Sequence, residues 1–522
     1  MIAVTQRIRR RADPTRSWRR MWCMSSPHPG NVGASAKLRQ LAERQVTAVQ
    51  VVDEAIGRID EVNSTTNAVA VRRFDEARAE ARTADQRRQA GGPLPPLLGV
   101  PITIKECLDL TGTASTFGLQ HRVSHRATAD DPYVARLRAA GAIVVAKSNV
   151  AQLLAFAESD NPVYGRVNNP RDPNRSAGGS SGGEGVLTST GASSLGVGTD
   201  IGGSCRIPAA WCGSVGFKPT AGLTVDQGRY SFARGNVGVE SQVGLLAPRA
   251  ADVELGLSVI AGASILSSAT VDLSSMTVGV FESDGLFEPC PATRRAVREA
   301  EVLLRSAGVR TVPWQPPAAD LLRSLYRALG SGLSEAWKPL LRETKVDRRI
   351  GQLVALSRLP LWMNRSAAWT FDRAGQRSLA VAARLFRTPK GLGEYFELVE
   401  SIQDLRAAVS NEVEQQGIDA ILSPATALPA ILHGASYDLG LMGSYCAMYN
   451  TLGWPAGVVP FTTVRTEECT DRVPGRDRVQ KVARASEMES TGLPIAVQIG
   501  APAGNDHVVL ALLSALEQHF PG

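Results

Sequence analysis

The chain has 522 residues, of which 43% are hydrophobic and 20% charged, with 57 Lys and Arg against 50 Asp and Glu. This composition excludes a largely disordered protein and supplies ample apolar surface for a core. The net charge of +7 is concentrated in the first 30 residues, where seven arginines accompany a single aspartate. The remainder is close to neutral, so the basic composition does not indicate a nucleic-acid partner, and we expect none.

Residues 1–34 form a basic tail that we expect to be disordered. No apolar run follows its arginines, as a secretory signal requires, and the sequence contains no run of 18 apolar residues. The seven cysteines form no Cys-x-x-Cys pair, and the six histidines lie outside the glycine-rich motifs described below. We therefore expect a cytoplasmic protein that uses no disulfide framework, metal or cofactor.

Helical and strand patterns alternate from the first ordered segment onwards. In the N-terminal part, the patterns predict helices over 36–63 and 74–88, a strand over 98–104, a helix over 131–140 and a strand over 142–146. The later patterns predict strands over 277–281, 309–312, 418–423, 456–464 and 493–499, and helices over 291–307 and 506–518.

Strands interleaved with helices, without a long linker, predict one large α/β domain over residues 35–522. The segment 465–490 is charged and lacks an apolar period, so we expect it to form an exposed insertion. Residues 161–185 are rich in Asn, Pro, Gly and Ser, which is typical of an irregular loop with a functional role.

Two glycine-rich serine motifs carry the chemistry of this sequence. Ser180 lies in Gly-Gly-Ser-Ser-Gly-Gly, and Ser204 lies 24 positions later in Asp-Ile-Gly-Gly-Ser. Glycines allow a substrate to approach the serine closely, and they leave backbone N–H groups free to bind an anion. We expect one serine to act as nucleophile and the other as proton relay. The N–H groups of an expected oxyanion hole are those of Ile201, Gly202, Gly203 and Ser204.

The base that activates the serine is not a histidine of either motif, and Lys105 is the better candidate. Lys105 ends the apolar strand predicted over 98–104. Burial there would disfavour the charged amine and lower its pKa, so that the amine could accept a proton. A lysine at a strand end is more often a surface cation, and only the two serine motifs favour the catalytic interpretation.

Two simpler interpretations of the first motif fail. Residues 178–182 match the Gly-x-Ser-x-Gly pattern of the α/β-hydrolases, but residues 169–177 before them contain two prolines and cannot form the strand that this pattern requires. The same motif lacks the Gly-Lys-Ser/Thr ending of a nucleotide-phosphate loop. A flexible turn is the usual role of such a stretch alone, but the second serine motif argues against it.

Together, these motifs resemble the amidase signature family. The resemblance rests on residues 99–106, 178–185, 198–208, 216–220 and 492–498, and it extends from about residue 36 to the C-terminus. Within the family, the chain is most similar to the fatty-acid amide hydrolases. The residues that indicate this are Gly-Gly-Ser-Ser-Gly-Gly-Glu-Gly at 178–185, Tyr449-Asn450 and Pro-Ala-Gly-Val-Val-Pro at 455–460.

The resemblance implies a Ser-Ser-Lys triad, in which Ser204 is the nucleophile that accepts the acyl group, Ser180 the relay and Lys105 the base. It also implies a cis peptide bond before the relay serine, supporting roles for Ser181 and Arg206, and an acyl pocket lined by Leu154. The implied fold is an α/β/α domain with a central mixed, twisted sheet covered by helices. The implied assembly is a homodimer. Glu106 stands where many members have Asp, a mild departure.

Residues 353–390 alternate apolar side chains with arginines. An amphipathic helix pair packed on the domain explains this pattern as well as a cap that takes lipid-like substrates from a membrane surface. The fatty-acid amide hydrolases have such a cap in this region. The sequence leaves both interpretations open.

The sequence thus predicts an amidase that hydrolyses a small-molecule carboxylic amide, fatty-acyl or aryl, to an acid and ammonia or an amine. An alternative is the glutaminase-type subunit of a tRNA-dependent amidotransferase, which would deliver ammonia within an obligate complex. The arginine- and tryptophan-containing segment 353–390 argues against this alternative.

Overall fold

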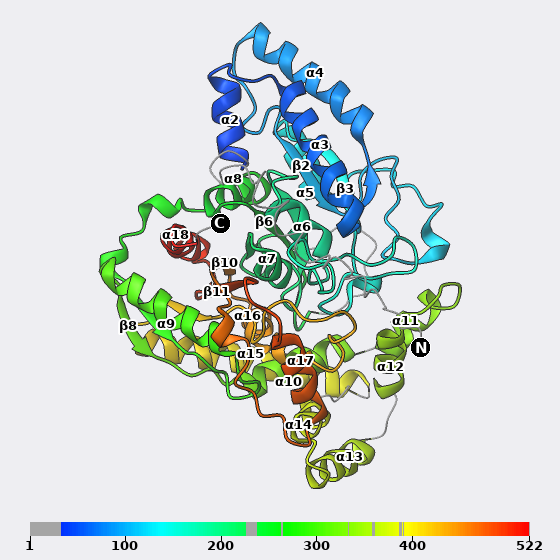
Figure 1. Ribbon diagram of the computed structural model, residues 1–522, viewed down its shortest axis with the longest axis vertical. Helices are drawn as coiled ribbons and strands as arrows, with labels where there is room; N and C mark the ends of the chain where they lie inside the picture. Colours follow the sequence, from blue (N-terminus) through cyan, green and yellow to red (C-terminus); the bar gives the residue numbers. More distant parts are fainter. Residues whose placement is uncertain are drawn as a thin grey trace, which may run out of the picture.

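A computed structural model describes residues 33–225, 237–262, 265–331, 333–357, 361–385, 389 and 391–520. Within these residues, eleven strands form one mixed sheet, and helices pack around it along its whole length (Figure 1). In sheet order the strands are β1 (Val69–Arg72), β3 (Ile143–Ser148), β2 (Pro101–Lys105), β4 (Gly196–Asp200), β6 (Gln242–Ala247), β5 (Val215–Lys218), β10 (Ala456–Thr463), β11 (Pro494–Gly500), β9 (Ala420–Pro424), β7 (Thr277–Val280) and β8 (Arg310–Pro313).

The central strands pair antiparallel, whereas β2 pairs in parallel with β3 and β4 on one side, and β7 with β8 and β9 on the other. The predicted single α/β domain with a mixed sheet covered by helices is therefore confirmed. The α-helices are α2 (Ala34–Ala42), α3 (Ala48–Thr66), α4 (Phe74–Ala90), α5 (Pro132–Ala139), α6 (Gly182–Ser189), α7 (Arg206–Cys212), α8 (Ala250–Ala261), α9 (Pro291–Ser306), α10 (Ala318–Gly330), α11 (Leu333–Leu340), α12 (Arg348–Ser357), α13 (Leu361–Arg373), α14 (Arg377–Leu385), α15 (Leu392–Gln415), α16 (Ser444–Leu452), α17 (Arg478–Glu487) and α18 (Asp506–Glu517).

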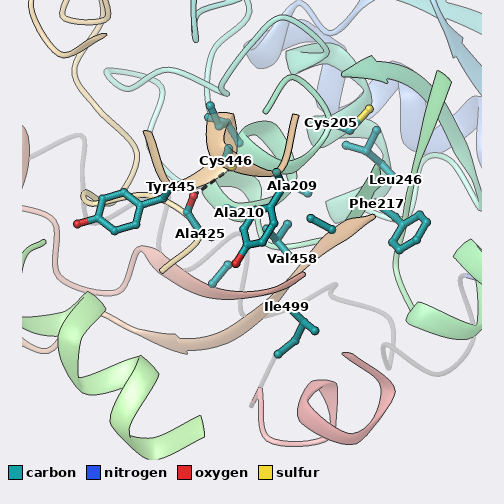
Figure 2. Packing of buried hydrophobic residues seen from close by; sticks show 14 of the residues in the cluster. Cys205, Ala209, Ala210, Phe217, Leu246, Ala425, Tyr445, Cys446, Val458 and Ile499 are labelled. Atoms are coloured by element: carbon teal, nitrogen blue, oxygen red, sulfur yellow. Dashed lines mark hydrogen bonds between the residues drawn. The ribbon is translucent and has the colours of Figure 1, made fainter. Parts of the chain in front are cut away.

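Helix α7 lies close to the central strands because its inward face is made of small residues. Ala209 and Ala210 of this helix are buried in the main core together with Val458 of β10, the strand neighbour of Gly216 (Figure 2). A Cβ added to Gly216 of β5 would lie 2.6 Å from the Cβ of Ala209, so the strand needs a glycine at this contact. The close approach sets α7 directly behind the loop that carries Ser204.

Two predicted segments differ in the structure. The helix expected over 36–63 is two helices, because Thr47 starts a new one with a capping box: its hydroxyl accepts the N–H of Gln50, whose side chain accepts the N–H of Thr47. In the segment 465–490, which was expected to be an exposed insertion, exposed positions alternate with buried ones. It contains α17, whose Val479 and Ala483 are buried, and a buried ion pair joins Arg472 to Glu487.

The predicted basic tail lies almost wholly outside the described residues, and Ala34, its last residue, already begins α2. Of the segment 353–390, residues 358–360, 386–388 and 390 lie outside the description as well. The described part forms α12, α13 and α14, which, together with α11, we call the outer helices. Figure 1 shows α13 at the edge of the molecule. None of the helices in the described part of the chain is long and apolar enough to cross a bilayer.

Candidate active site

The structure brings the predicted base and relay into direct contact. Lys105 is the last residue of β2 and is fully buried. Its Nζ donates a hydrogen bond to Ser180 Oγ at 2.7 Å and another to Thr199 Oγ1 at 2.9 Å. The two oxygens fix the direction of the amine, although Lys105 and Ser180 are 75 residues apart in the sequence.

Ser180 lies in a tight turn that only glycines allow. Gly178 has a φ of +87°, and a Cβ there would lie 2.7 Å from Cα of Pro208. A Cβ at Gly179 would lie 2.6 Å from the backbone nitrogen of Glu158. The peptide bond between Gly179 and Ser180 is cis, as the resemblance implied. The turn is thus enclosed by backbone from two other segments.

Sequence reasoning missed one residue that holds this turn. Ser159 is buried, and its hydroxyl donates to the carbonyl oxygen of Gly178 at 3.0 Å and accepts the N–H of Gly182 at 2.9 Å. It therefore bridges both sides of Ser180. Ser159 lies just before the irregular loop expected over 161–185, and the sequence around it does not show which hydroxyl makes the bridge.

Ser204 lies between β4 and α7 and is partly exposed, unlike the buried Ser180. The two motifs meet through the backbone, because the N–H of Ser181 donates to the carbonyl oxygen of Ser204 at 3.2 Å. Gly203 has a φ of +109°, and a Cβ there would lie 2.6 Å from that of Cys446. The glycine before Ser204 is therefore required by both backbone conformation and space.

The backbone N–H groups before Ser204 do not all face the same way. The N–H of Gly203 donates to Oδ1 of Asp200 at 2.8 Å, and the N–H of Cys205 donates to Oδ2 of the same carboxylate at 3.1 Å. The Gly203 N–H is therefore engaged by Asp200, and its expected place in an oxyanion hole stays a prediction. The other expected donors are the N–H groups of Ile201, Gly202 and Ser204.

A buried ion pair clamps the two ends of the Ser204 loop. Arg206 donates from Nη2 to Asp200 Oδ1 at 3.0 Å and from Nε to Oδ2 at 3.1 Å, and both side chains are fully buried. Burial alone would raise the pKa of the Asp200 carboxyl, but the charge and hydrogen bonds of Arg206 hold it well below its usual range. This geometry explains the supporting role implied for Arg206.

Two further residues complete this clamp from the other half of the chain. Arg206 donates to Asn450 Oδ1 at 2.6 Å and to Gln498 Oε1 at 2.9 Å, and Asn450 Nδ2 donates to Asp200 Oδ1 at 2.9 Å. Both residues stand in segments that carried the family resemblance, but their contacts with Arg206 were not predicted. The clamp therefore joins segments that are about 250 to 290 positions apart.

The contacts of the remaining predicted residues differ from one another. Ser181 is buried, and its hydroxyl reaches the carbonyl oxygen of Thr199 at 3.5 Å. Leu154 is partly buried and packs against the main core, with a left-handed φ of 58°. Its contact with an acyl chain stays a prediction. The Glu106 carboxylate accepts the N–H groups of Thr116 and Phe117, so it holds the neighbouring loop.

A surface hollow of about 720 Å3 lies elsewhere on the described part of the molecule, between the segment 465–490, α9 and α14. Its lining includes Arg294, Arg377 and Arg472, but none of the predicted site residues. The hydrogen bonds of Lys105, not this hollow, locate the candidate active site.

Known proteins match the chain along almost all of its length. The family described as Amidase matches residues 50–510. Fatty acid amide hydrolase 1 of Caenorhabditis elegans is 29% identical over 98% of this chain and 91% of its own length. Fatty-acid amide hydrolase 1 of Sus scrofa is 33% identical over 81% of this chain and 76% of its own length.

A solved structure of a fatty acid amide hydrolase has the same fold. It superposes with a TM-score of 0.79 over 96% of this chain and 87% of that chain, at 22% identity. The family match covers far more than half of the chain and includes both serine motifs and Lys105. The chain belongs to the amidase signature family.

Proposed function

We propose that this amidase hydrolyses its substrate through an acyl-enzyme on Ser204, with Ser180 as relay and Lys105 as base. The observation that carries the proposal is the 2.7 Å hydrogen bond between Lys105 Nζ and Ser180 Oγ, in a fully buried position. The contact of the Ser181 N–H with the carbonyl oxygen of Ser204 supports it, because it keeps the relay and the nucleophile on adjoining backbone.

The first half of the reaction forms the acyl-enzyme. Ser204 Oγ attacks the amide carbon while its proton passes to Ser180 Oγ, and the proton of Ser180 passes to the neutral amine of Lys105. Negative charge develops on the substrate oxygen, which the N–H groups of Ile201, Gly202 and Ser204 stabilise. The protons then return through Ser180 to the leaving nitrogen, the C–N bond breaks, and ammonia or an amine departs.

Water completes the reaction by the same proton path. It attacks the acyl carbon, gives a proton towards Ser180 and Lys105, and the bond to Ser204 Oγ breaks as that oxygen regains its proton. The products are a carboxylic acid and the free enzyme. Every step needs the amine of Lys105 to exchange a proton, and its burial, which disfavours the charged form, suits this task.

The substrate that we infer is a small-molecule amide with a fatty-acyl or aryl acid part. The names of the relatives from Caenorhabditis elegans and Sus scrofa support the fatty-acyl class. The proposal includes a cytoplasmic homodimer whose segment 353–390 contacts a membrane surface. Exposed Trp369 and Met363 on α13 support this contact. The glutaminase-subunit alternative is not favoured by these relatives. It would be supported by glutaminase activity that requires a partner subunit.

Labelling with a fluorophosphonate probe tests the proposal without knowledge of the substrate. We expect one labelled peptide, containing Ser204, and no label on the Ser204→Ala protein. Ser258→Ala is the matched control, because Ser258 is an exposed serine of α8, and its labelling should equal that of the parent. Label on a different serine, or label that survives Ser204→Ala, would refute the assignment of the nucleophile.

A further inference from the structure

A second buried ionisable group lies on the same side of the sheet as Lys105. Side chains of a strand alternate between its faces, so Thr103 and Lys105 of β2 project to the same side, about 7 Å apart along the strand. Glu184 of α6 packs against this side, and Thr103 Oγ1 donates to its Oε2 at 2.5 Å. A carboxyl group therefore stands within one strand repeat of the proposed base.

The carboxyl of Glu184 fits in the core because the neighbouring strand has a glycine, Gly196, beside it. Glu184 is completely buried, and a Cβ added to Gly196 of β4 would lie 2.3 Å from its Oε2. The other oxygen, Oε1, has no regular hydrogen bond to the described residues, although the Ser148 hydroxyl faces the same carboxyl. A buried carboxyl with few donors is held more readily in its protonated form.

Lys105 is the charged group that acts on this carboxyl from β2. On β3, Lys147 is in register with Ile104 and so belongs to the opposite side of the sheet, where its amine donates to the Ser115 hydroxyl. From β4, Asp200 is already paired with Arg206 of α7. The other titratable groups on elements packed against α6 are the thiols of Cys205 and Cys212, whose pKa values burial raises, and Glu106 at the end of β2.

The electrostatic balance of Glu184 places its titration in the working range of an enzyme. Burial raises the pKa of Glu184 to about 7, while the hydroxyls of Thr103 and Ser148 and the charge of Lys105 act in the opposite direction. The carboxyl thus changes charge near neutral pH. Each change alters the electrostatic potential at the amine of Lys105, which is buried on the same side of the sheet.

We propose that Glu184 is a positioning residue that acts through Lys105, by controlling how tightly the amine holds its proton. An ionised Glu184 favours the charged amine, and a protonated Glu184 lets the amine become neutral and accept the proton of Ser180. The inference rests on the proposed Ser-Ser-Lys function. It adds to the triad a buried carboxyl whose charge acts on the base.

The pH dependence of fluorophosphonate labelling tests this inference. In the parent protein, the labelling rate of Ser204 should rise with pH as Lys105 loses its proton, and Lys105→Ala should remove the rise. Glu184→Gln removes the negative charge but keeps the shape. Above pH 7 the Glu184 carboxyl of the parent is ionised and favours the charged amine. Without that charge the neutral amine is favoured, so the midpoint of the rise should move to lower pH by about one to two units.

The matched control is Glu517→Gln. Glu517 of α18 is another carboxyl whose pKa burial raises, and it accepts the N–H of Ala250 outside the serine–lysine side of the sheet. This control should leave the midpoint unchanged. If Glu184→Gln does not fold, Thr103→Val decides: loss of the hydroxyl disfavours the ionised carboxyl, so the midpoint should move in the same direction by a smaller amount.

The outcomes separate the inference from the function on which it rests. If the parent is not labelled at Ser204, the proposed function fails. If labelling is at Ser204 and Lys105→Ala removes the pH rise, but folded Glu184→Gln keeps the parent midpoint or moves it to higher pH, only the inference is overturned. A shift to lower pH that is equally large in Glu517→Gln also overturns it, because the effect is then not specific to Glu184.

Discussion

The two regions of this molecule that bear on function, the serine–lysine centre and the outer helices, are held in place by different forces. At the centre, Lys105, Asp200 and Arg206 are fully buried, and their polar atoms bond to one another and to backbone. On the outer helices, Trp369 is 59% exposed and stacks under the guanidinium of Arg373, and Arg384 pairs with Asp372 at the surface.

This difference predicts how each region responds to mutation. A buried polar group that loses its partner keeps its full desolvation cost, whereas an exposed pair exchanges its partner for water at little cost. Substitutions at the centre should therefore change rate or stability by large factors. Substitutions on the exposed face of the outer helices should leave the fold intact and act on what the surface contacts.

The largest effect is expected from removal of the base. Lys105→Ala should lower the rate of amide hydrolysis by about 10²- to 10⁴-fold and flatten its alkaline rise, because no other group then accepts the proton of Ser180. Steady-state kinetics from pH 6 to 10 would measure both. Exposed Lys481→Ala on α17 is the control and should behave as the parent. A pH profile unchanged in Lys105→Ala would exclude Lys105 as the base.

The next effect is on stability. Asp200→Asn leaves Arg206 buried without its counter-charge, which should lower the free energy of unfolding by about 3–5 kcal/mol in urea titrations. The Asp75→Asn control, on the highly exposed surface of α4, should stay within about 0.5 kcal/mol of the parent. A loss as small as that of the control would mean that Asn450, Gln498 and the carbonyl oxygen of Cys446 are enough to hold Arg206.

The pH dependence of this contribution has a definite sign. The pKa of Asp200 is lower in the folded protein than in the unfolded chain, so the stabilisation is present above the unfolded value of about 3.9 and is lost as the pH falls through the folded value. Acid unfolding of the parent should therefore include a component that Asp200→Asn lacks. Parallel stability curves for both proteins below pH 4 would contradict this assignment.

The centre also shows what the sequence can predict. Seven of the eleven strands were predicted: β2, β3, β7, β8, β9, β10 and β11. All but β8, whose sequence is Arg-Thr-Val-Pro, lie in mainly apolar segments. Strand β4 was missed because Gly-Val-Gly-Thr-Asp has only one apolar side chain, that of Val197, and so shows no apolar run. Its glycines are explained only by the neighbours that they admit, such as the carboxyl of Glu184 at Gly196.

Site residues divide in the same way, into those that lie in a local sequence motif and those whose role depends on contacts in the folded protein. Lys105, Ser180 and Ser204 stand in local motifs, so the sequence alone proposes them as candidates. Ser159 has no motif, and its role depends on a hydroxyl that reaches the Ser180 turn from a separate loop. The contacts of Arg206 with residues far along the chain depend on the folded sheet, so a single sequence carries no local signal for them.

The junction between the two regions should give an intermediate effect. Arg349 at the start of α12 pairs with Glu158 at 3.0 Å and with Asp347 at 2.6 Å, and Glu158 lies against Gly179. Arg349→Ala should lower stability by about 1.5–3 kcal/mol, with faster hydrogen exchange at 345–357 and around Glu158. Exposed Arg365→Ala on α13 is the control. Faster exchange confined to α12 would show that the junction does not couple the regions.

The smallest effect on the fold, and the sharpest test of the comparison, is expected at Trp369. Trp369→Glu should change the free energy of unfolding by less than about 0.5 kcal/mol, because the ring is mostly in water and contacts Arg373 at the surface. If α13 contacts a membrane, the same substitution should reduce co-sedimentation with anionic phospholipid vesicles, since it removes an interfacial aromatic ring and adds a negative charge. Thr370→Glu adds the same charge at the neighbouring exposed position without removing the ring. Equal binding by the parent, Trp369→Glu and Thr370→Glu would leave the outer helices as packing elements and remove the membrane contact from the proposed function.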